Sequence, residues 1–182
     1  MPAAEERALL ERAKQSAAGF GELFDATYDR IYAYAYRRVG TRAAAEDIAA
    51  SVFEDALRGI RRVRWQGKPA LAWLYRIAAR RVADYYRKAH GEIALDSDAA
   101  SEDDVDGVER EEEQVSVRRA LAELNESDRE VIRLAFFEEL DGKGIAATLN
   151  CTTNTAYVRL HRALKRLETV LRDEDARQEF IR

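Results

Sequence analysis

Residues 151–167 read CTTNTAYVRLHRALKRL, and this segment has the pattern of an amphipathic helix. Its apolar residues recur at spacings of three and four, which places them on one side of an α-helix. These seam residues are Ala156, Leu160, Leu164 and Leu167, continued by Leu171. The basic residues Arg159, Arg162, Lys165 and Arg166 fall largely outside the seam. Thr152 is the expected N-cap, because its hydroxyl can accept a hydrogen bond from an amide of the first turn.

A shorter helix is expected immediately before this segment. Residues 145–150 read IAATLN and end at an asparagine, a residue that often terminates helices. Two helices joined by so tight a turn, the second of them basic, indicate a helix-turn-helix that binds DNA.

The composition of the whole chain favours helix. Its 182 residues include nine glycines and only two prolines, and 47% of them are apolar. This apolar content is enough for a packed core, in one domain or two small ones. Because no segment alternates with period two, we predict an all-α fold without a sheet.

Cysteine content and the N-terminal sequence bear on the compartment. A single cysteine excludes an internal disulfide and a cysteine-rich zinc site, and it suits a reducing cytosol. The N-terminus is acidic and is followed by no signal-peptide core, and no apolar run approaches the roughly 18 residues of a membrane span. We therefore expect a soluble, cytoplasmic protein.

The formal charge of −4 conceals an uneven distribution. Residues 58–88 are strongly basic with Asp84 as their one acid, whereas residues 92–113 are strongly acidic with Arg110 as their one base. The sequence thus predicts an N-terminal domain over 1–90, a flexible acidic linker over 91–114 and a C-terminal domain over 115–182. The linker is either a solvated spacer or a mimic of nucleic acid that covers a basic face; the sequence leaves both open.

The N-terminal domain is expected to be a bundle of about four helices. The first covers roughly residues 5–17, and the second begins near Gly19 with an aromatic and aliphatic stripe. The third follows Thr41, a plausible cap, and the fourth follows the break at 67–69. The third should bury Ala45, Ile48, Ala49, Val52, Phe53 and Ala56, and the fourth should bury Leu71, Leu74, Ile77, Ala78 and Val82.

Aromatic residues are interspersed in the basic stretch. They are Trp65, Trp73, Tyr75, Tyr85 and Tyr86. Basic side chains attract phosphates, and exposed rings can stack on unpaired bases. Together they suit melted or single-stranded DNA better than an intact duplex, although Trp73, between two leucines, is expected in the core.

Four segments together resemble the extracytoplasmic-function (ECF) sigma factors, a group within the sigma-70 family of bacterial transcription initiation factors. The segments are residues 20–32, residues 45–57, residues 72–88, and residues 121–163 with the helix-turn-helix. They occur in the family's order, and the resemblance spans about residues 19–171. It implies an N-terminal domain that binds core RNA polymerase and melts the minus-ten promoter element, and a C-terminal domain that binds the minus-thirty-five element.

The resemblance also implies site residues and partners. Contact with core polymerase falls on Asp47, Ile48, Val52 and Phe53. The residues implied to bind minus-ten DNA are Arg58, Arg61, Arg62, Trp65, Lys68, Arg76, Arg80, Arg87 and Lys88. The residues implied to bind minus-thirty-five DNA are Thr153, Asn154, Thr155, Tyr157, Val158, Arg159, Arg162 and Arg166. The implied partners are the beta and beta-prime subunits of core RNA polymerase, promoter DNA and an anti-sigma factor.

Several positions depart from the family's usual pattern. Ala50-Ser51 replaces a Gln-Glu pair, and Arg80 replaces a frequent asparagine of the melting helix. Gly142 and Gly144 stand where an aromatic and an acid are usual, and the pair Tyr157-Val158 replaces Lys-Ser. The change at Ala50-Ser51 predicts a weaker or rearranged contact with polymerase, and Arg80 predicts an altered minus-ten base preference. The changes in the helix-turn-helix predict an unusual minus-thirty-five specificity.

No constellation of residues suggests an enzyme, a metal site or a cofactor. His90 and His161 are isolated in sequence, no glycine-rich phosphate loop occurs, and Cys151 is more often a packed residue than a redox centre in such a position. One alternative is a two-domain transcriptional regulator that acts without polymerase, and a more distant one is a nuclease. The aromatic and basic stretch argues against the regulator, and the missing metal constellation argues against the nuclease.

Overall fold

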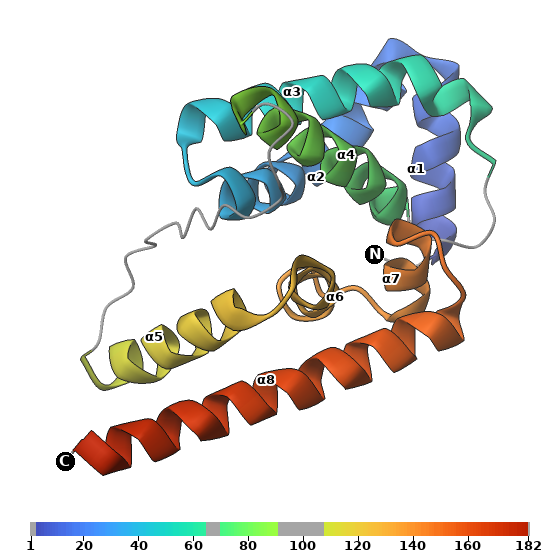
Figure 1. Ribbon diagram of the computed structural model, residues 1–182. Coiled ribbons are helices and arrows are strands. Elements are labelled where there is room, and N and C mark those ends of the chain that lie inside the picture. The colour runs from blue at the N-terminus through green and yellow to red at the C-terminus, as the bar shows by residue number, and fades with distance from the viewer. Residues whose placement is uncertain (1–2, 65–69, 91–107, 182) are drawn as a thin grey trace. The chain divides into compact units, whose positions relative to one another are not determined.

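The computed structural model describes residues 3–64, 70–90 and 108–181, and every regular element in these ranges is helical (Figure 1). The all-α prediction is therefore confirmed. The elements are α1 (Ala3–Gln15), α2 (Ala17–Val39), α3 (Arg42–Gly59), the 3-10 turn η1 (Ile60–Arg62), α4 (Ala70–His90), α5 (Val108–Glu123), α6 (Glu126–Phe136), α7 (Gly142–Thr148) and α8 (Thr153–Ile181).

The helices separate into two compact units. The first contains α1 to α4 with η1 and also residues 147–150, and the second contains α5, α6, α8 and residues 142–146 of α7. Most of the expected acidic linker, residues 91–107, lies outside the described residues, and residues 108–114 are helical at the start of α5.

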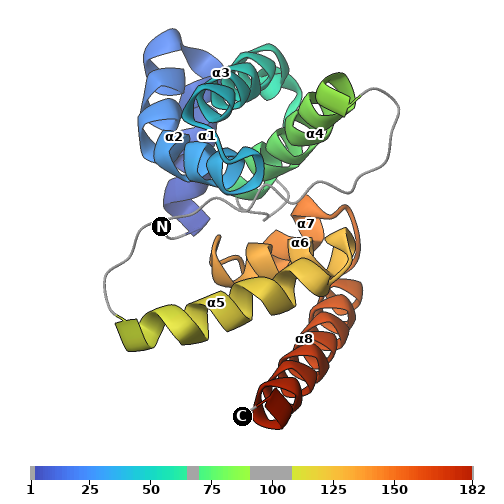
Figure 2. The same cartoon turned by 60° about the vertical axis from the view of Figure 1, so that its left-hand side comes forward.

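In the first unit, α2 packs against α1, α3 and α4, and α3 packs against α4 (Figure 2). All six α3 residues expected to face inward are buried, as are four of the five from α4; Ile77 is half-buried. One core cluster joins α1 to η1 and the start of α4: Leu10 and Ile60 are buried in it, and Trp73 packs against it. The apolar periodicity of the sequence thus accounts for the packing of this unit.

Turn chemistry sets the ends of α2 and α3. Ser16 caps α2, its Oγ accepting from the Gly19 amide at 3.0 Å, and Gly40 ends the helix at φ 70°. Thr41 occupies the N-cap position of α3, but its side chain makes no capping hydrogen bond. The predicted position of Thr41 as the cap residue of α3 is therefore confirmed, although its hydroxyl does not contribute to the cap.

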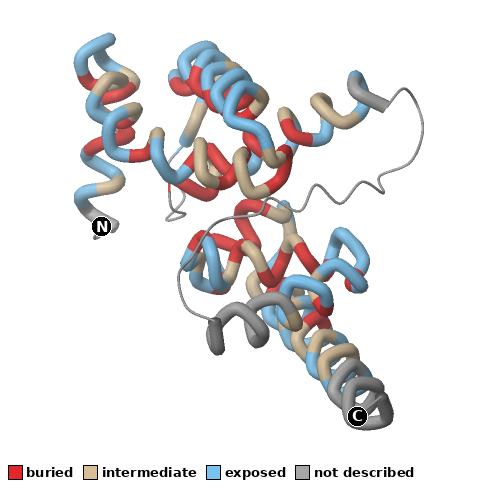
Figure 3. Tube along the Cα trace, turned by 90° about the vertical axis from the view of Figure 1, so that its left-hand side faces the viewer, coloured by how far each residue is buried: buried red, intermediate tan, exposed pale blue. Residues whose placement is uncertain are grey.

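In the second unit, α5 and α6 both pack against α8. Val131 and Leu134 of α6 are buried, as are Ala156 and Ala163 of α8. In both units the buried residues lie on the inner faces of the helices, and the outer faces are exposed (Figure 3). The amphipathic pattern of α8 is confirmed, and the helix continues past Leu171 to Ile181.

Candidate nucleic-acid interface

The helix-turn-helix consists of α7, a tight turn and α8. Helix α7 begins at Gly142, three residues before the expected start at Ile145, and the Gly144 amide donates to Asp141 Oδ1 at 2.7 Å. Asn150 lies in the turn with φ 51°, a left-handed conformation that asparagine tolerates. The Thr155 amide donates to Thr152 Oγ1 at 3.1 Å, so the predicted N-cap of α8 is confirmed.

The outer face of α8 is polar, basic and partly apolar. Asn154, Tyr157, Val158, Arg159 and Arg162 are exposed, so their side chains can reach a ligand. Thr153 and Thr155 are half-buried. The Thr155 hydroxyl also shares a hydrogen bond of 2.8 Å with that of Thr152, which ties it to the cap.

The guanidinium of Arg166 in α8 pairs with Asp128 of α6. The Asp128 side chain is only 10% exposed, and Asn125 Nδ2 donates to its Oδ2 at 2.8 Å. Asn125 in turn caps α6 by accepting from the Asp128 amide at 3.0 Å. Arg166 therefore joins α8 to α6, a role that the sequence did not reveal.

A second basic surface belongs to the first unit. Its exposed members are Arg58, Arg61, Arg62, Arg76, Arg80, Arg87 and Lys88. Trp65 and Lys68, expected in the same interface, lie outside the described residues. Arg87 pairs with Asp84 within α4, and Arg58 pairs with Glu54 within α3 at 3.1 Å.

Asp55 of α3 gathers three arginines at the edge of this surface. Its carboxylate lies 2.6 Å from Arg81, 3.0 Å from Arg80 and 3.3 Å from Arg58, and its side chain is 15% exposed. The hydrogen bond from Arg81, helped by Arg80, lowers the pKa of the Asp55 carboxyl below its ordinary value. The same hydrogen bond raises the pKa of Arg81, so both groups stay charged. The cluster thereby fixes where the guanidinium of Arg80 lies.

The aromatic residues of the basic stretch divide between core and surface. Tyr75 is fully buried, with its ring 5.1 Å from that of Tyr34, so it cannot stack on a base. Trp73 is half-buried against the α1 cluster, as expected of a core residue. Tyr85 and Tyr86 are half-buried, and the Tyr86 hydroxyl donates to the carbonyl oxygen of Arg38.

The residues expected to contact polymerase do not share one surface. Asp47 is exposed, but Ile48, Val52 and Phe53 are at most 5% exposed and belong to the core of the first unit. Their role in polymerase binding stays a prediction, and the periodicity that places them on one face of α3 packs that face into the core. On the outer face of α3, Leu57 is 55% exposed.

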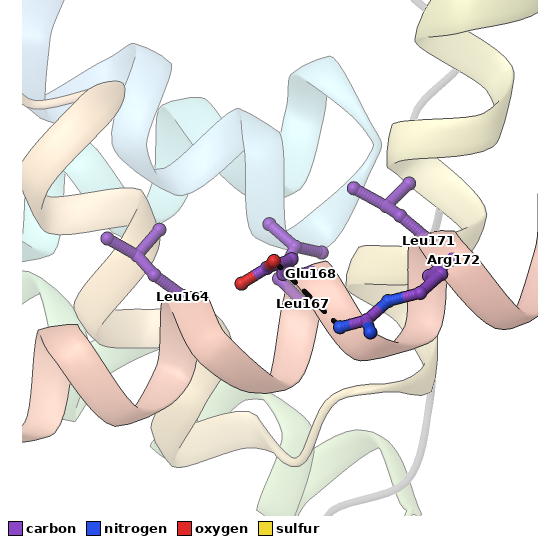
Figure 4. Close-up of a pocket in the computed structure, with 5 residues that line it drawn as sticks. All are labelled: Leu164, Leu167, Glu168, Leu171 and Arg172. Carbon is purple, nitrogen blue, oxygen red and sulfur yellow. Dashed lines mark ion pairs between the residues drawn. The ribbon is translucent and has the colours of Figure 1, made fainter.

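A shallow groove of about 460 Å³ follows the distal part of α8. Figure 4 shows Leu164, Leu167 and Leu171 along it, with Glu168 and Arg172 paired at 3.8 Å beside them. The groove is thus lined by seam leucines and one surface ion pair. This lining holds no arrangement of side chains suited to acid-base or nucleophilic chemistry. Within the described residues, no group of three or more His, Cys, Asp and Glu side chains is placed to bind a metal ion. No described helix has the length and apolarity required to cross a bilayer.

An all-α protein with a helix-turn-helix and a further basic helical surface has the features of the DNA-binding transcription proteins. Two family models match the chain: Sigma-70 region 2 over residues 23–92, and Sigma-70, region 4 over residues 114–167. The first match falls on the first helical unit, and the second falls on the second unit apart from residues 147–150. The chain therefore belongs to the sigma-70 family of RNA polymerase sigma factors.

Individual relatives refine this assignment to the ECF group. The chain is 31% identical over 186 residues to the ECF RNA polymerase sigma factor SigW of Bacillus subtilis, covering 92% of this chain and 99% of that protein. It is 32% identical over 174 residues to the ECF sigma factor BldN of Streptomyces coelicolor, covering 91% of this chain but 66% of the relative's length. The solved sigma factor RpoE of Bartonella quintana, in complex with the anti-sigma factor NepR, has a similar fold, with a TM-score of 0.61, 22% identity and coverage of 84% of this chain and 96% of that one.

Proposed function

We propose that this ECF sigma factor binds core RNA polymerase and directs it to specific promoters, with its first unit at the minus-ten element and its second at the minus-thirty-five element. The observation that carries the proposal is the match of regions 2 and 4 to two separate helical units. Each of these units also has an exposed basic surface, which the attraction of phosphates requires.

The minus-thirty-five contact is assigned to the exposed residues at the start of α8. Asn154 and Arg162 can donate hydrogen bonds to base edges or phosphates, and Arg159 supplies a further charge. Thr153 and Thr155 contribute less direct contact because they are half-buried. Arg166 supports the helix through Asp128 rather than by reaching outward.

The minus-ten contact is assigned to the basic residues of η1 and α4. Arg61, Arg62, Arg76 and Lys88 are exposed and can approach DNA phosphates directly. Arg58, Arg80 and Arg87 pair with carboxylates, so each would exchange an acidic partner for a phosphate on binding. Trp65 and Lys68 remain part of this proposal, as the aromatic and basic members for unpaired bases.

The polymerase contact is assigned to the outer face of α3, with Asp47 and Leu57. We further propose that an anti-sigma factor restrains the protein until a signal releases it, as suggested by the family and by the partner of the Bartonella RpoE. The protein would act in the cytoplasm, where core polymerase is found, as a binding factor without catalytic activity or cofactor of its own.

Reconstituted transcription tests this function. Purified chain is added to core bacterial RNA polymerase with genomic fragments, and the 5′ ends of the transcripts are mapped. A sigma factor yields discrete start sites that are absent with core enzyme alone. The alternative, a helix-turn-helix regulator independent of polymerase, predicts tight binding to duplex DNA without association with core enzyme. That second result would overturn the proposal.

A further inference from the structure

Two large apolar side chains are exposed side by side near the start of α8. Tyr157 is 56% exposed and Val158 is 39% exposed, between Asn154 and the basic residues Arg159 and Arg162. Val158 follows the buried Ala156 by two positions, so it lies about 200° around the helix from the seam. It therefore shares the outward face with Asn154 and Arg162, the face assigned to DNA.

Tyr157 lies at the edge of this face, and Gly142 of α7 determines where its ring can lie. A Cβ atom on Gly142 would be 2.4 Å from Cζ and 2.6 Å from the hydroxyl oxygen of Tyr157. No real side chain tolerates such distances, so the ring occupies its position because residue 142 has no side chain. The close packing of α7 against α8 at this point therefore depends on the pair Gly142 and Tyr157.

The apolar character of Tyr157 and Val158 indicates which group on a DNA base they can contact. Val158 has no group that can hydrogen-bond to a base, and the exposed ring of Tyr157 is largely apolar. In the major groove the one apolar group on a base is the C5 methyl of thymine, which apolar side chains contact. We propose that Tyr157 and Val158 contact thymine methyl groups of the minus-thirty-five element, and that Gly142 is the positioning residue for the Tyr157 ring. This inference rests on the proposed promoter-binding function.

Replacement of individual thymines by deoxyuridine tests the contact, because it removes only the methyl group. The full-length chain is assembled with core polymerase on its mapped promoter, and holoenzyme affinity is measured for each thymine in turn. Loss of a methyl contact should weaken binding about fourfold at each contacted position. Val158→Ala should abolish the deoxyuridine effect at one position and Tyr157→Ala at another, while other positions keep the wild-type pattern.

Gly142→Ala tests the positioning role. The atoms that meet the new Cβ belong to the far end of the Tyr157 side chain, so we expect the ring to move while the helices stay folded. The deoxyuridine effect assigned to Tyr157 should then disappear or move to another position. Gly142→Ala in combination with Tyr157→Ala should behave as Tyr157→Ala alone. The matched control is Gly144→Ala in the same helix, whose Cβ would meet Leu140 and Asp141 at 3.2–3.3 Å and not Tyr157, so its pattern should equal wild type.

The outcomes separate this inference from the function beneath it. A holoenzyme that starts transcription normally but is insensitive to deoxyuridine, or a mapped element without thymine, would overturn the methyl contact and leave the sigma function standing. A Gly142→Ala variant with the wild-type pattern would overturn the positioning role. A chain that never supports initiation by core polymerase would overturn the proposed function and this inference with it.

Discussion

The carboxylate of Asp55 in α3 and the guanidinium of Arg81 in α4 lie 2.6 Å apart, and they connect two helices of the first unit near its basic surface. Arg80 binds the same carboxylate at 3.0 Å. Because Asp55 is 15% exposed and Arg81 28% exposed, water screens this cluster less than an ordinary surface pair. The cluster therefore contributes to the stability of the unit and also positions an arginine proposed to bind DNA.

We expect Asp55→Asn to lower the free energy of unfolding of the first unit by about 1–3 kcal/mol, because Arg81 loses a charged, partly buried partner. Denaturant unfolding followed by circular dichroism measures this change. The control is Glu46→Gln, which removes the charge from the exposed pair with Arg42 at 2.8 Å and should leave stability nearly unchanged. Equal losses for the two variants would contradict the role given to Asp55.

The lowered pKa of Asp55 also predicts a dependence on acid pH. Its carboxyl is more acidic in the folded chain than in the unfolded one, so its contribution is fully present above the unfolded pKa of about 3.8. The contribution is lost as the pH falls below that value and through the folded pKa. Unfolding measured between neutral and acid pH should show a smaller loss of stability for Asp55→Asn than for wild type. Parallel profiles would argue against the shift.

Local patterns predicted most of the helices, and tertiary contacts account for what the sequence did not reveal. The spacing of Ala156 and its seam partners located α8, and Thr152 was found because a cap depends on neighbours within one turn. The pairing of Asp128 with Arg166 joins residues far apart in the chain, so no local pattern contained it. The periodicity of the sequence also predicted that the face of α3 carrying Phe53 packs inward, whereas the assignment of this residue to polymerase rests on family position and stays a prediction.

Gly19 and Gly21, two positions apart in α2, should respond to alanine in opposite directions. A Cβ on Gly19 would lie 2.2 Å from the carbonyl oxygen of Arg12, where the backbone of α1 passes, whereas one on Gly21 would meet nothing within 4 Å. We expect Gly19→Ala to destabilise the unit by about 1–3 kcal/mol or more through overpacking. Gly21→Ala should stabilise it by roughly 0.5–1 kcal/mol through helix propensity. Thermal unfolding of both variants measures the two effects, and a harmless Gly19→Ala would refute the close approach of α1 and α2.

Alanine variants of Arg166 and Arg162 in α8 should differ: the first should mainly lower stability, and the second should mainly weaken DNA binding. Arg166→Ala leaves the Asp128 carboxylate with Asn125 but without its cation, so the second unit should lose about 1–3 kcal/mol of stability. Arg162→Ala removes an exposed side chain and should change stability by less than about 0.5 kcal/mol. If Arg162 neutralises a phosphate, its loss should reduce the salt dependence of promoter binding by about one unit of slope. Denaturation and binding titrations at several salt concentrations measure both quantities, and the assignment fails if the two variants behave alike.

Phe53 and Leu57 of α3 should show which face of the helix meets polymerase. Phe53 is 5% exposed and its ring lies 4.7 Å from that of Phe24, so Phe53→Ala should cost about 3–5 kcal/mol of stability. Leu57 is 55% exposed, so Leu57→Ala should leave the fold intact. If Leu57 is a central contact, its truncation should weaken binding to core polymerase by at least about fivefold, the loss of about 1 kcal/mol that defines an energetically important interface residue. Competition binding with labelled core enzyme measures this effect, and a stable Leu57→Ala variant with unchanged affinity would move the polymerase contact away from this face, because the opposite face of α3 is already occupied by the core.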